Sequence, residues 1–428
     1  MIIQNVKGGY DFLPKEQRIR NYINGILAET FEEYGFNPVE TPILCYYDML
    51  SDKYDEGNDI LKEIYKLKDQ GNRDLGLRYD LTVPFAKLFA LNKNTLPYPF
   101  KRYEIAKVFR DGPVKVGRDR EFTQCDADVV GIEGQLIEAE LLSLYVTGFK
   151  RLNIEISIKY NSRNLMNGLI LECDVSEDML SCVTTAVDKK DKLSEKEFAF
   201  ELTNLGLDTD AIDKLNKYFS MSLEELTNEF KDTTNESIIK GLDELNQLSL
   251  YLNKMGIGDV CSFSSSLARG QNYYTGNVFE VYEKNGKIRG SIGAGGRYDK
   301  MVGNFIGDGE TYPTVGLSFG LSSIYELLKN SPMFDEKSNI DYYIVPLDTG
   351  VECLNIANKL RELGYKVEVE MTRKKLKKSL DYANREKIQY VIIVGESEIE
   401  NKQVNIKNMF DGTQTTIDLD KLDELKNN

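Results

Sequence analysis

The segment from Ala106 to Gly131 carries side chains suited to bind a nucleotide. Three arginines, Arg110, Arg118 and Arg120, flank a hairpin-like loop that starts at Asp111. Guanidinium groups pair with phosphate oxygens in a bidentate geometry, so these arginines favour a polyphosphate ligand. A salt-bridged surface hairpin is the alternative interpretation of the same residues.

A run rich in hydrogen-bond acceptors follows this loop at the spacing of a strand. Gln124, Asp126 and Asp128 alternate along the run, and Phe122 precedes them with a free aromatic face. Carboxylates and an amide suit a small cationic or hydrogen-bonding ligand, and an aromatic ring suits a purine base. The segment therefore predicts a nucleotide subsite beside a subsite for a second small molecule.

The 428-residue chain contains no histidine and no tryptophan. Mechanisms that depend on imidazole are therefore excluded, among them serine and cysteine triads, most zinc sites and histidine phosphotransfer. The chemistry must depend on arginine, carboxylate, amide and tyrosine side chains and on metal-bound phosphate. We expect no protein ligands for a metal ion.

Composition indicates a soluble globular protein, with 41% hydrophobic and 29% charged residues. We expect no membrane partner, because no apolar run is long enough to span a bilayer. The N-terminal residues lack the features of a signal peptide, and the six scattered cysteines predict a reducing, cytoplasmic location. The net charge of −15 argues against nonspecific nucleic-acid binding, but residues 373–378 form a local basic run.

Hydrophobic periodicity divides the chain into several parts. It predicts a mixed domain over residues 1–161 and 257–330, interrupted by a helical insertion over residues 162–256. A separate domain of alternating strands and helices follows over residues 338–428, and this alternation predicts a mostly parallel sheet. The individual elements predicted are helices over residues 136–152 and 373–387 and strands over residues 75–82, 102–110, 122–131 and 153–160.

With these parts in place, the chain resembles the histidyl-tRNA synthetases, a family of class II aminoacyl-tRNA synthetases. The likeness covers nearly the whole length and rests on six segments in the family's order. They are KGGYDFLP, LGLRYDLTVPFAK, VFRDGPVKVGRDREFTQCDADVVG, SLARGQNYYTGNVFEVY, GAGGRYDKMV and RKKLKKSLDYA. The resemblance implies an α+β catalytic domain with an antiparallel sheet of six or seven strands, the helical insertion, and a C-terminal α/β anticodon-binding domain.

The resemblance also implies an activity, which is the ATP-dependent ligation of L-histidine to histidine tRNA through a histidyl-adenylate. ATP and Mg²⁺ would be the cofactors. The protein would be a homodimer, with the first helix and residues 36–42 near the interface.

Site residues follow from the matched motifs. Asp80 and Thr82 would hold the histidine α-amino group. The remaining histidine-binding residues implied are Gln124, Asp128, Arg269, Tyr273 and Tyr274. The ATP-binding residues implied are Arg110 on the α-phosphate, Phe122 on adenine, and Arg118 and Arg120 on the phosphates or in ordering the loop. Arg110 and Arg269 would be the catalytic residues.

One motif departs from the family's pattern. Gly320-Leu321-Ser322-Ser323 stands where the family has a glycine-leucine-glutamate-arginine run, so Ser323 replaces the arginine expected on the ATP γ-phosphate. Lys115, Arg118 or a second magnesium ion could compensate. The alternative function is a synthetase paralogue that does not charge tRNA. Such a paralogue could be a histidine sensor or the regulatory subunit of ATP phosphoribosyltransferase, which lacks the anticodon-binding domain.

Overall fold

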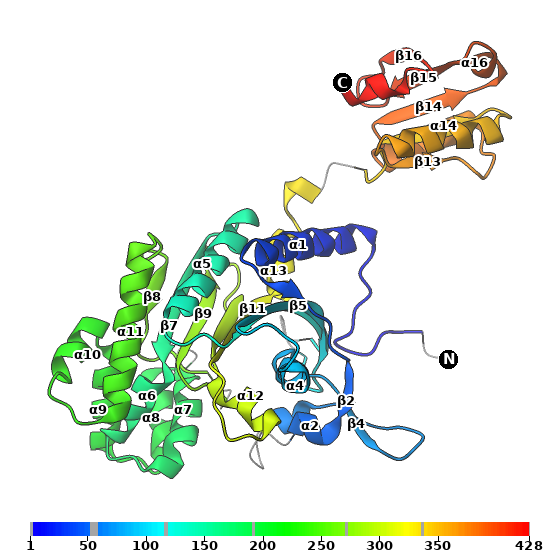
Figure 1. The fold of residues 1–428 in the computed structure, drawn as a ribbon. Coiled ribbons are helices and arrows are strands. Elements are labelled where there is room, and N and C mark those ends of the chain that lie inside the picture. Colours follow the sequence, from blue (N-terminus) through cyan, green and yellow to red (C-terminus); the bar gives the residue numbers. More distant parts are fainter. Residues whose placement is uncertain are drawn as a thin grey trace. The chain divides into compact units, whose positions relative to one another are not determined.

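The computed structural model describes residues 3–51, 59–114, 119–190, 193–269, 273–334 and 338–427. The chain forms two compact units, Met1–Lys329 and Asn330–Asn428 (Figure 1). None of the described helices combines the length and the apolar character that a bilayer crossing needs.

An eight-stranded sheet forms the centre of the first unit. Its spatial order is β1-β5-β6-β11-β10-β9-β7-β8. The strands are β1 (Asn37–Pro38), β5 (Phe100–Phe109), β6 (Glu121–Val130), β7 (Ile156–Ser162), β8 (Cys261–Phe263), β9 (Asn277–Glu283), β10 (Gly293–Arg297) and β11 (Thr314–Gly320). The six central strands pair antiparallel, as expected, whereas the edge strands β1 and β8 were not expected and each pairs in parallel. β1 has two residues and β8 has three. Such short strands show no recognisable alternation of apolar and polar residues in the sequence.

Helices cover both faces of this sheet (Figure 1). One face packs against α1 (Pro14–Glu33), α5 (Leu136–Arg151) and α13 (Leu321–Leu328). Helix α1 presents Ile19, Ile23, Leu27 and Phe31 as a buried stripe at helical spacing. The chain turns at Gly35, whose φ of 79° suits a residue that follows a helix C-terminus.

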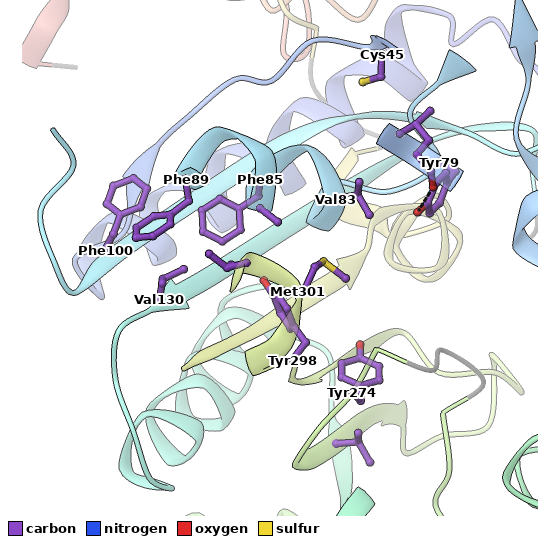
Figure 2. Close-up of a cluster of buried hydrophobic side chains, with 14 of the residues drawn as sticks. Cys45, Tyr79, Val83, Phe85, Phe89, Phe100, Val130, Tyr274, Tyr298 and Met301 are labelled. Carbon is purple, nitrogen blue, oxygen red and sulfur yellow. Dashed lines mark hydrogen bonds between the residues drawn. The ribbon is translucent and has the colours of Figure 1, made fainter. Parts of the chain in front are cut away.

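The other face carries α4 (Thr82–Asn92) and α12 (Asp299–Ile306). Figure 2 shows Phe85 and Phe89 of α4 packed against Phe100, Val130 and Met301. This cluster connects α4 and α12 to the start of β5 and the end of β6.

The strand predicted over residues 75–82 is shorter than expected. Strand β4 (Asp74–Leu77) ends early, in a small sheet with β2 (Leu44–Tyr46) and β3 (Lys66–Lys68). Helix α4 begins at Thr82 because the Asp80 carboxylate accepts the Val83 N–H at 3.0 Å, a capping interaction that stops the extended chain. The short helices α2 (Tyr47–Ser51) and α3 (Asp59–Glu63) connect β2 to β3.

The segment between β7 and β8 is helical throughout its described residues. Its helices are α6 (Arg163–Leu171), α7 (Leu180–Val187), α8 (Glu195–Asn204), α9 (Thr209–Ser220), α10 (Leu223–Glu229) and α11 (Glu236–Lys254), with a 3-10 turn at Glu177–Met179. Val183, Phe198, Leu202 and Leu215 form its buried centre. The acidic, leucine-bearing composition is therefore that of amphipathic helices around their own small core.

The second unit is a five-stranded sheet in the order β13-β12-β14-β15-β16. Its elements are β12 (Tyr342–Pro346), α14 (Gly350–Glu362), β13 (Val367–Val369), α15 (Leu376–Arg385), β14 (Tyr390–Val394), α16 (Glu396–Glu400), β15 (Gln403–Asn408) and β16 (Gln414–Asp418). The first three strands pair in parallel and the last two are antiparallel. The α+β class with a C-terminal α/β domain is confirmed, although the second sheet is less parallel than expected.

The helix predicted over residues 373–387 begins later than expected. Arg373 has a φ of 51°, which is incompatible with a right-handed helix. Glu370 accepts the backbone N–H groups of Thr372 and Lys374 at 2.8 and 3.2 Å. These bonds hold the first basic residues in a loop, so α15 starts only at Leu376.

Candidate functional site

A cavity of about 280 Å³ lies over the central strands of the eight-stranded sheet. Its floor is formed by small residues of β10 and β11. In one row across the sheet, Asp126 pairs with Ser318, Ser318 with Ala294, and Ala294 with Glu280. Gly316 lies in the next row, where a Cβ atom would stand 1.8 Å from Oδ1 of Asp128. The floor is therefore open because Ala294, Gly316 and Ser318 carry small side chains or none.

Strand β6 supplies one wall of the cavity. Phe122, Gln124, Asp126 and Asp128 are separated by two residues each, so they project from the same face of the strand. All four line the cavity. Asp126 was not among the predicted histidine-binding residues, although the period of two is sufficient to place it beside its neighbours.

Asp80 lies at the start of α4, where it is 2% exposed. Its Oδ1 atom caps the helix, while Oδ2 is buried and has no partner among the described residues. Burial raises the pKa of Asp80 to about 6. Asp80 and Thr82 both line the cavity, so an unpaired carboxylate oxygen is available to a cationic group there.

Asp128 contacts two neighbouring side chains, although its Oδ2 atom has no hydrogen-bond partner among the described residues. Its Oδ2 atom lies 2.6 Å from Nη2 of Arg102, and Oδ1 accepts the hydroxyl of Tyr298. Arg102 is fully buried and also donates to the Leu81 carbonyl at 3.0 Å. Asp128 therefore stabilises the joint between β5, β6 and the start of α12 in addition to lining the cavity.

Asp126, like Asp128, has one buried oxygen without a hydrogen-bond partner in the described part of the chain. Its side chain is 3% exposed, and Oδ1 has no hydrogen-bond partner within the described residues. Burial raises the pKa of Asp126 to about 8, and the neighbouring Asp128 charge adds to the effect. The oxygen of Gln124 is also buried without a described partner.

Arg110 and Phe122 form the outer part of the same wall. Arg110 Nε donates to the Tyr79 carbonyl at 3.1 Å. Its guanidinium lies 5.1 Å from the centroid of the Phe122 ring, a favourable cation–π distance. Both residues line the cavity, and the carbonyl bond fixes the direction of the arginine.

Arg269 enters from the opposite wall, beside β9. It forms an ion pair with Glu280, and Glu280 also accepts the hydroxyl of Tyr282. The Nε atom of Arg269 is buried without a described partner. Glu280 therefore holds one edge of the guanidinium. The remaining N–H donors can bind a ligand that presents a pair of oxygens, such as a carboxylate or a phosphate.

Tyr273 and Tyr274 follow Arg269 and also line the cavity. Their ring centroids are 4.7 Å apart, and Tyr273 packs edge-on against Tyr298 at 5.9 Å. Tyr274 is 9% exposed, and burial raises the pKa of its hydroxyl. A Cβ atom on Gly296 would lie 2.8 Å from the Tyr274 ring. Strand β10 therefore packs directly against this aromatic ring at Gly296.

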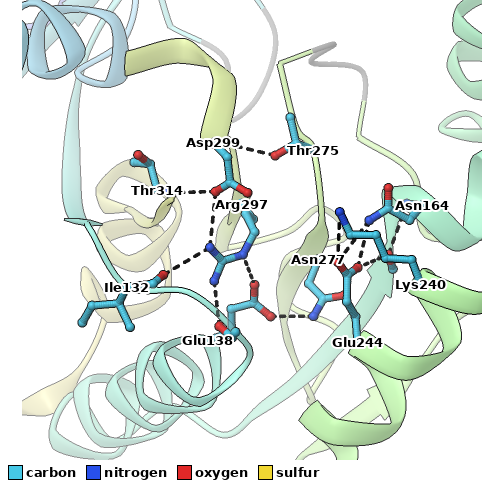
Figure 3. Close-up of polar contacts among 12 residues, drawn as sticks. Ile132, Glu138, Asn164, Lys240, Glu244, Thr275, Asn277, Arg297, Asp299 and Thr314 are labelled. Atoms are coloured by element: carbon cyan, nitrogen blue, oxygen red, sulfur yellow. Dashed lines mark hydrogen bonds and ion pairs between the residues drawn. The ribbon is translucent and has the colours of Figure 1, made fainter. Parts of the chain in front are cut away.

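A buried polar network holds the strands that carry this floor. Figure 3 shows Arg297 at its centre, with Nε 2.6 Å from the Glu138 carboxylate of α5. Glu138 also accepts from Asn277 at the start of β9. Asp299 accepts the Thr314 N–H at 2.8 Å. The ends of β9, β10 and β11 are thereby fixed to α5 and α12.

The remaining predicted residues are placed differently. Arg120 pairs with Asp111 at 3.4 Å and is not among the residues that line the cavity, a geometry that favours ordering of the loop. Ser323 lines the cavity at the start of α13. Arg118 and Lys115 lie outside the described residues.

Among the described residues, no group of three or more histidine, cysteine, aspartate or glutamate side chains is arranged to hold a metal ion. In the second unit, residues 373–375 are exposed and follow Met371, which is 65% exposed.

Comparison with known proteins places these observations in a family. A family model described as histidyl-tRNA synthetase matches residues 8–324, and an anticodon binding domain model matches residues 341–427. Histidine–tRNA ligase 1 of Bacillus anthracis is 45% identical over 424 residues, which are 99% of both chains.

Two solved structures are also similar. The histidyl-tRNA synthetase from Nostoc sp. PCC 7120 matches with a TM-score of 0.86 and 27% identity, covering 100% of this chain and 99% of that one. A Bacillus halodurans protein described as an ATP phosphoribosyltransferase regulatory subunit/histidyl-tRNA synthetase matches with a TM-score of 0.78 and 21% identity. The match covers 92% of this chain and 98% of that one. At this identity the match shows a shared fold.

Proposed function

The chain belongs to the histidyl-tRNA synthetase family, and from this premise we propose that it joins L-histidine to histidine tRNA. The histidine carboxylate attacks the α-phosphate of ATP, which gives histidyl-adenylate and pyrophosphate. The terminal ribose of the tRNA then receives the histidyl group. The observation that carries the proposal is that Asp80, Arg110 and Arg269 line one cavity although they are distant in sequence.

The two ends of the cavity suit the two substrates. Histidine binds at the inner end, where Asp80 and Thr82 take its ammonium group and the acceptors of β6 surround its ring. Gln124, Asp128, Tyr273 and Tyr274 complete the subsite. ATP binds toward the outer end, with its adenine on Phe122.

The catalytic groups are the two arginines. Negative charge grows on the α-phosphate oxygens during the displacement, and fixed guanidinium groups stabilise it without a general base. Arg110 and Arg269 approach from opposite walls, which suits two sides of one phosphate. Arg120 acts by ordering the loop before β6, and Arg118 remains a candidate phosphate ligand.

Mg²⁺ enters with the nucleotide in this proposal. When bound, Mg²⁺ would neutralise negative charge on the triphosphate. Near Ser323, Lys115, Arg118 or a second magnesium ion would compensate the charge of the γ-phosphate.

The two units have different functions in this proposal. Residues 1–161 and 257–330 form the catalytic domain, interrupted by the helical insertion over residues 162–256. Residues 338–428 bind the anticodon, for which the exposed basic residues 373–375 supply positive charge. All six cysteines are unpaired, which supports a cytoplasmic location.

The protein acts as a homodimer in this proposal. Ile43, Leu44, Tyr46 and Leu67 are each at least 42% exposed. They lie on β2 and β3 or directly before β2, next to the segment predicted at the interface. A second copy would cover this apolar surface, and light scattering of the purified protein would give the mass of the particle.

The alternative functions are less well supported. The similarity to the Bacillus halodurans protein is at the level of fold, whereas the full-length relatives at 45% identity are histidine–tRNA ligases. The anticodon-binding match over residues 341–427 also disfavours a regulatory subunit without that domain.

Pyrophosphate exchange tests the proposal directly. The purified protein is expected to exchange labelled pyrophosphate into ATP only when histidine is present, and then to charge histidine tRNA. Folded protein that binds histidine but shows no exchange would instead support the sensor.

A further inference from the structure

We propose that the helical insertion takes part in the chemical step by holding Arg269 in place. Ser265 and Ala268, which connect the insertion to the chain just before Arg269, are the positioning residues. This inference rests on the proposed function, because it concerns a guanidinium assigned there to the α-phosphate.

The segment that leads from β8 to Arg269 lies between two hydrophobic cores. Leu267 belongs to the buried cluster beside the cavity that also contains Tyr274. Ala268, the next residue, is 5% exposed and belongs to the buried centre of the insertion, together with Leu202. Because tightly packed cores transmit displacements, a shift of the insertion would move the backbone that carries Arg269.

A buried hydrogen bond connects the same segment to helix α9 of the insertion. Ser265 is 4% exposed, and its hydroxyl donates to the Phe219 carbonyl at 2.7 Å. Phe219 lies in the last turn of α9, where carbonyl groups have no acceptor role within the helix. Loss of the hydroxyl would therefore leave a carbonyl without its partner and release the segment from α9.

The catalytic sheet holds the segment from the other side. Asn161 of β7 is 1% exposed, and its Nδ2 atom donates to the carbonyls of Ser265 and Leu267 at 3.1 and 2.9 Å. Its Oδ1 atom accepts the Ser162 N–H at 2.8 Å. The backbone before Arg269 is thus fixed to β7 by one residue and to the insertion by Ser265 and Ala268.

The insertion is attached firmly enough to act as a support. Helices α6 and α11 are so close that a Cβ atom on Gly241 would lie 2.3 Å from the Leu165 nitrogen. Figure 3 shows Glu244 of α11, which accepts from Asn164 at 3.0 Å and from the Ser162 hydroxyl at 2.9 Å. These contacts join the insertion to the end of β7.

Such support matters because Arg269 acts through its position. Glu280 orients the guanidinium, but it does not fix the backbone from which the side chain extends. Stabilisation of a developing charge depends on donors that are already in place, and a displacement of about 1 Å can cost up to about 100-fold in rate. Ser265 and Ala268 supply this second restraint.

The test compares Ser265→Ala with Ser220→Ala by histidine-dependent pyrophosphate exchange. Ser220 is exposed, and its hydroxyl donates to the Lys217 carbonyl of the same helix, also at 2.7 Å. The control therefore loses the same type of bond without a change at the segment before Arg269. Ser265→Ala is expected to lower kcat about three- to tenfold, with KM for histidine and ATP changed less than about twofold. Ser220→Ala should match the wild type.

A double-mutant cycle separates positioning from a general structural role. In Arg269→Gln, which lacks the guanidinium, Ser265→Ala should lower kcat by less than about twofold, because there is no arginine left to position. An equal reduction of kcat by Ser265→Ala in both backgrounds would overturn the inference, and so would equal kcat in Ser265→Ala and Ser220→Ala.

If Ser265→Ala does not fold, Ala268→Gly is measured in the same cycle. That change removes a methyl group from the buried centre of the insertion, and full kcat in the variant would also overturn the inference. Each of these results leaves the proposed function intact, since that function fails only if the wild type shows no histidine-dependent exchange.

Discussion

Glu280 is expected to matter to catalysis although the sequence prediction did not include it. Its carboxylate accepts from Arg269 and from the hydroxyl of Tyr282, so it holds the guanidinium in one orientation. Replacing Glu280 by glutamine keeps the size and one acceptor oxygen but removes the charge. Arg269 would then remain in the wall with weaker anchorage.

The magnitude follows from the bonds lost. A hydrogen bond to a charged group contributes roughly 1.5–3 kcal/mol, and about 1.4 kcal/mol is a tenfold change in rate. Glu280→Gln should therefore lower kcat/KM for adenylate formation about 10- to 100-fold. Loss of the Arg269 donor itself would cost about 3–4 kcal/mol, which sets the upper limit. Tyr282→Phe removes one neutral donor and should cost about three- to tenfold.

The assay is pyrophosphate exchange with separate determination of kcat and KM for both substrates. The reduction should fall mainly on kcat, because a fixed guanidinium contributes most when charge develops on the phosphate. Glu155→Gln is the control, since Glu155 is an exposed glutamate whose carbonyl bonds to the chain just after β9. Combining Glu280→Gln with Arg269→Lys should cost less than the sum of the single changes, because the two residues form one unit.

Two results would refute this reasoning. Full kcat in Glu280→Gln would show that Arg269 is oriented by other contacts. A fall in melting temperature with equal rises of both KM values would show that Glu280 stabilises β9 and has no specific effect on the phosphate.

Three further predictions follow from the same contacts. Because the pKa of Asp126 in the folded protein is about 8 against an ordinary 3.8, the folded state retains a proton that the unfolded chain loses. Its favourable contribution is complete below about pH 4 and is lost as the pH rises toward 8, so urea titrations should show wild-type stability falling by up to about 1.4 kcal/mol per pH unit more than in Asp126→Asn. Gly316→Ala would place a methyl group 1.8 Å from Asp128 Oδ1, so calorimetry should show a loss of about 1–3 kcal/mol, and histidine-dependent exchange should be lost. Changing residues 373–375 to glutamine should raise KM for tRNA about tenfold in charging assays at low salt and leave pyrophosphate exchange unchanged.

The residues of β6 show which features of the site the sequence alone can predict. A period of two places Phe122, Gln124, Asp126 and Asp128 on one face without any knowledge of the fold, and all four line the cavity. The fact that Asp128 contacts a buried arginine and a tyrosine could not be predicted in this way. That depends on Arg102 and Tyr298, which come from β5 and from the start of α12.

Other differences also have non-local causes. The role of Glu280 depends on the register of β9 against β10 and on the course of the chain at Arg269, neither of which a motif specifies. The early end of β4 depends on the cap formed by Asp80. The late start of α15 depends on Glu370. The overall architecture was inferred from family resemblance, whereas periodicity alone indicated helices, strands and a separate C-terminal α/β unit.

The distribution of charge in the cavity suggests why histidine and ATP do not exchange places. Asp80 and Asp128 lie on one side, where a triphosphate would be repelled by buried carboxylates that cannot move away. The guanidinium groups of Arg110 and Arg269 lie where the histidine carboxylate and the α-phosphate would meet, and each anion would otherwise repel the other. In the proposed function, recognition and catalysis would thus use the same asymmetry, because the carboxylates that hold the amino acid would also direct its own carboxylate toward the arginines.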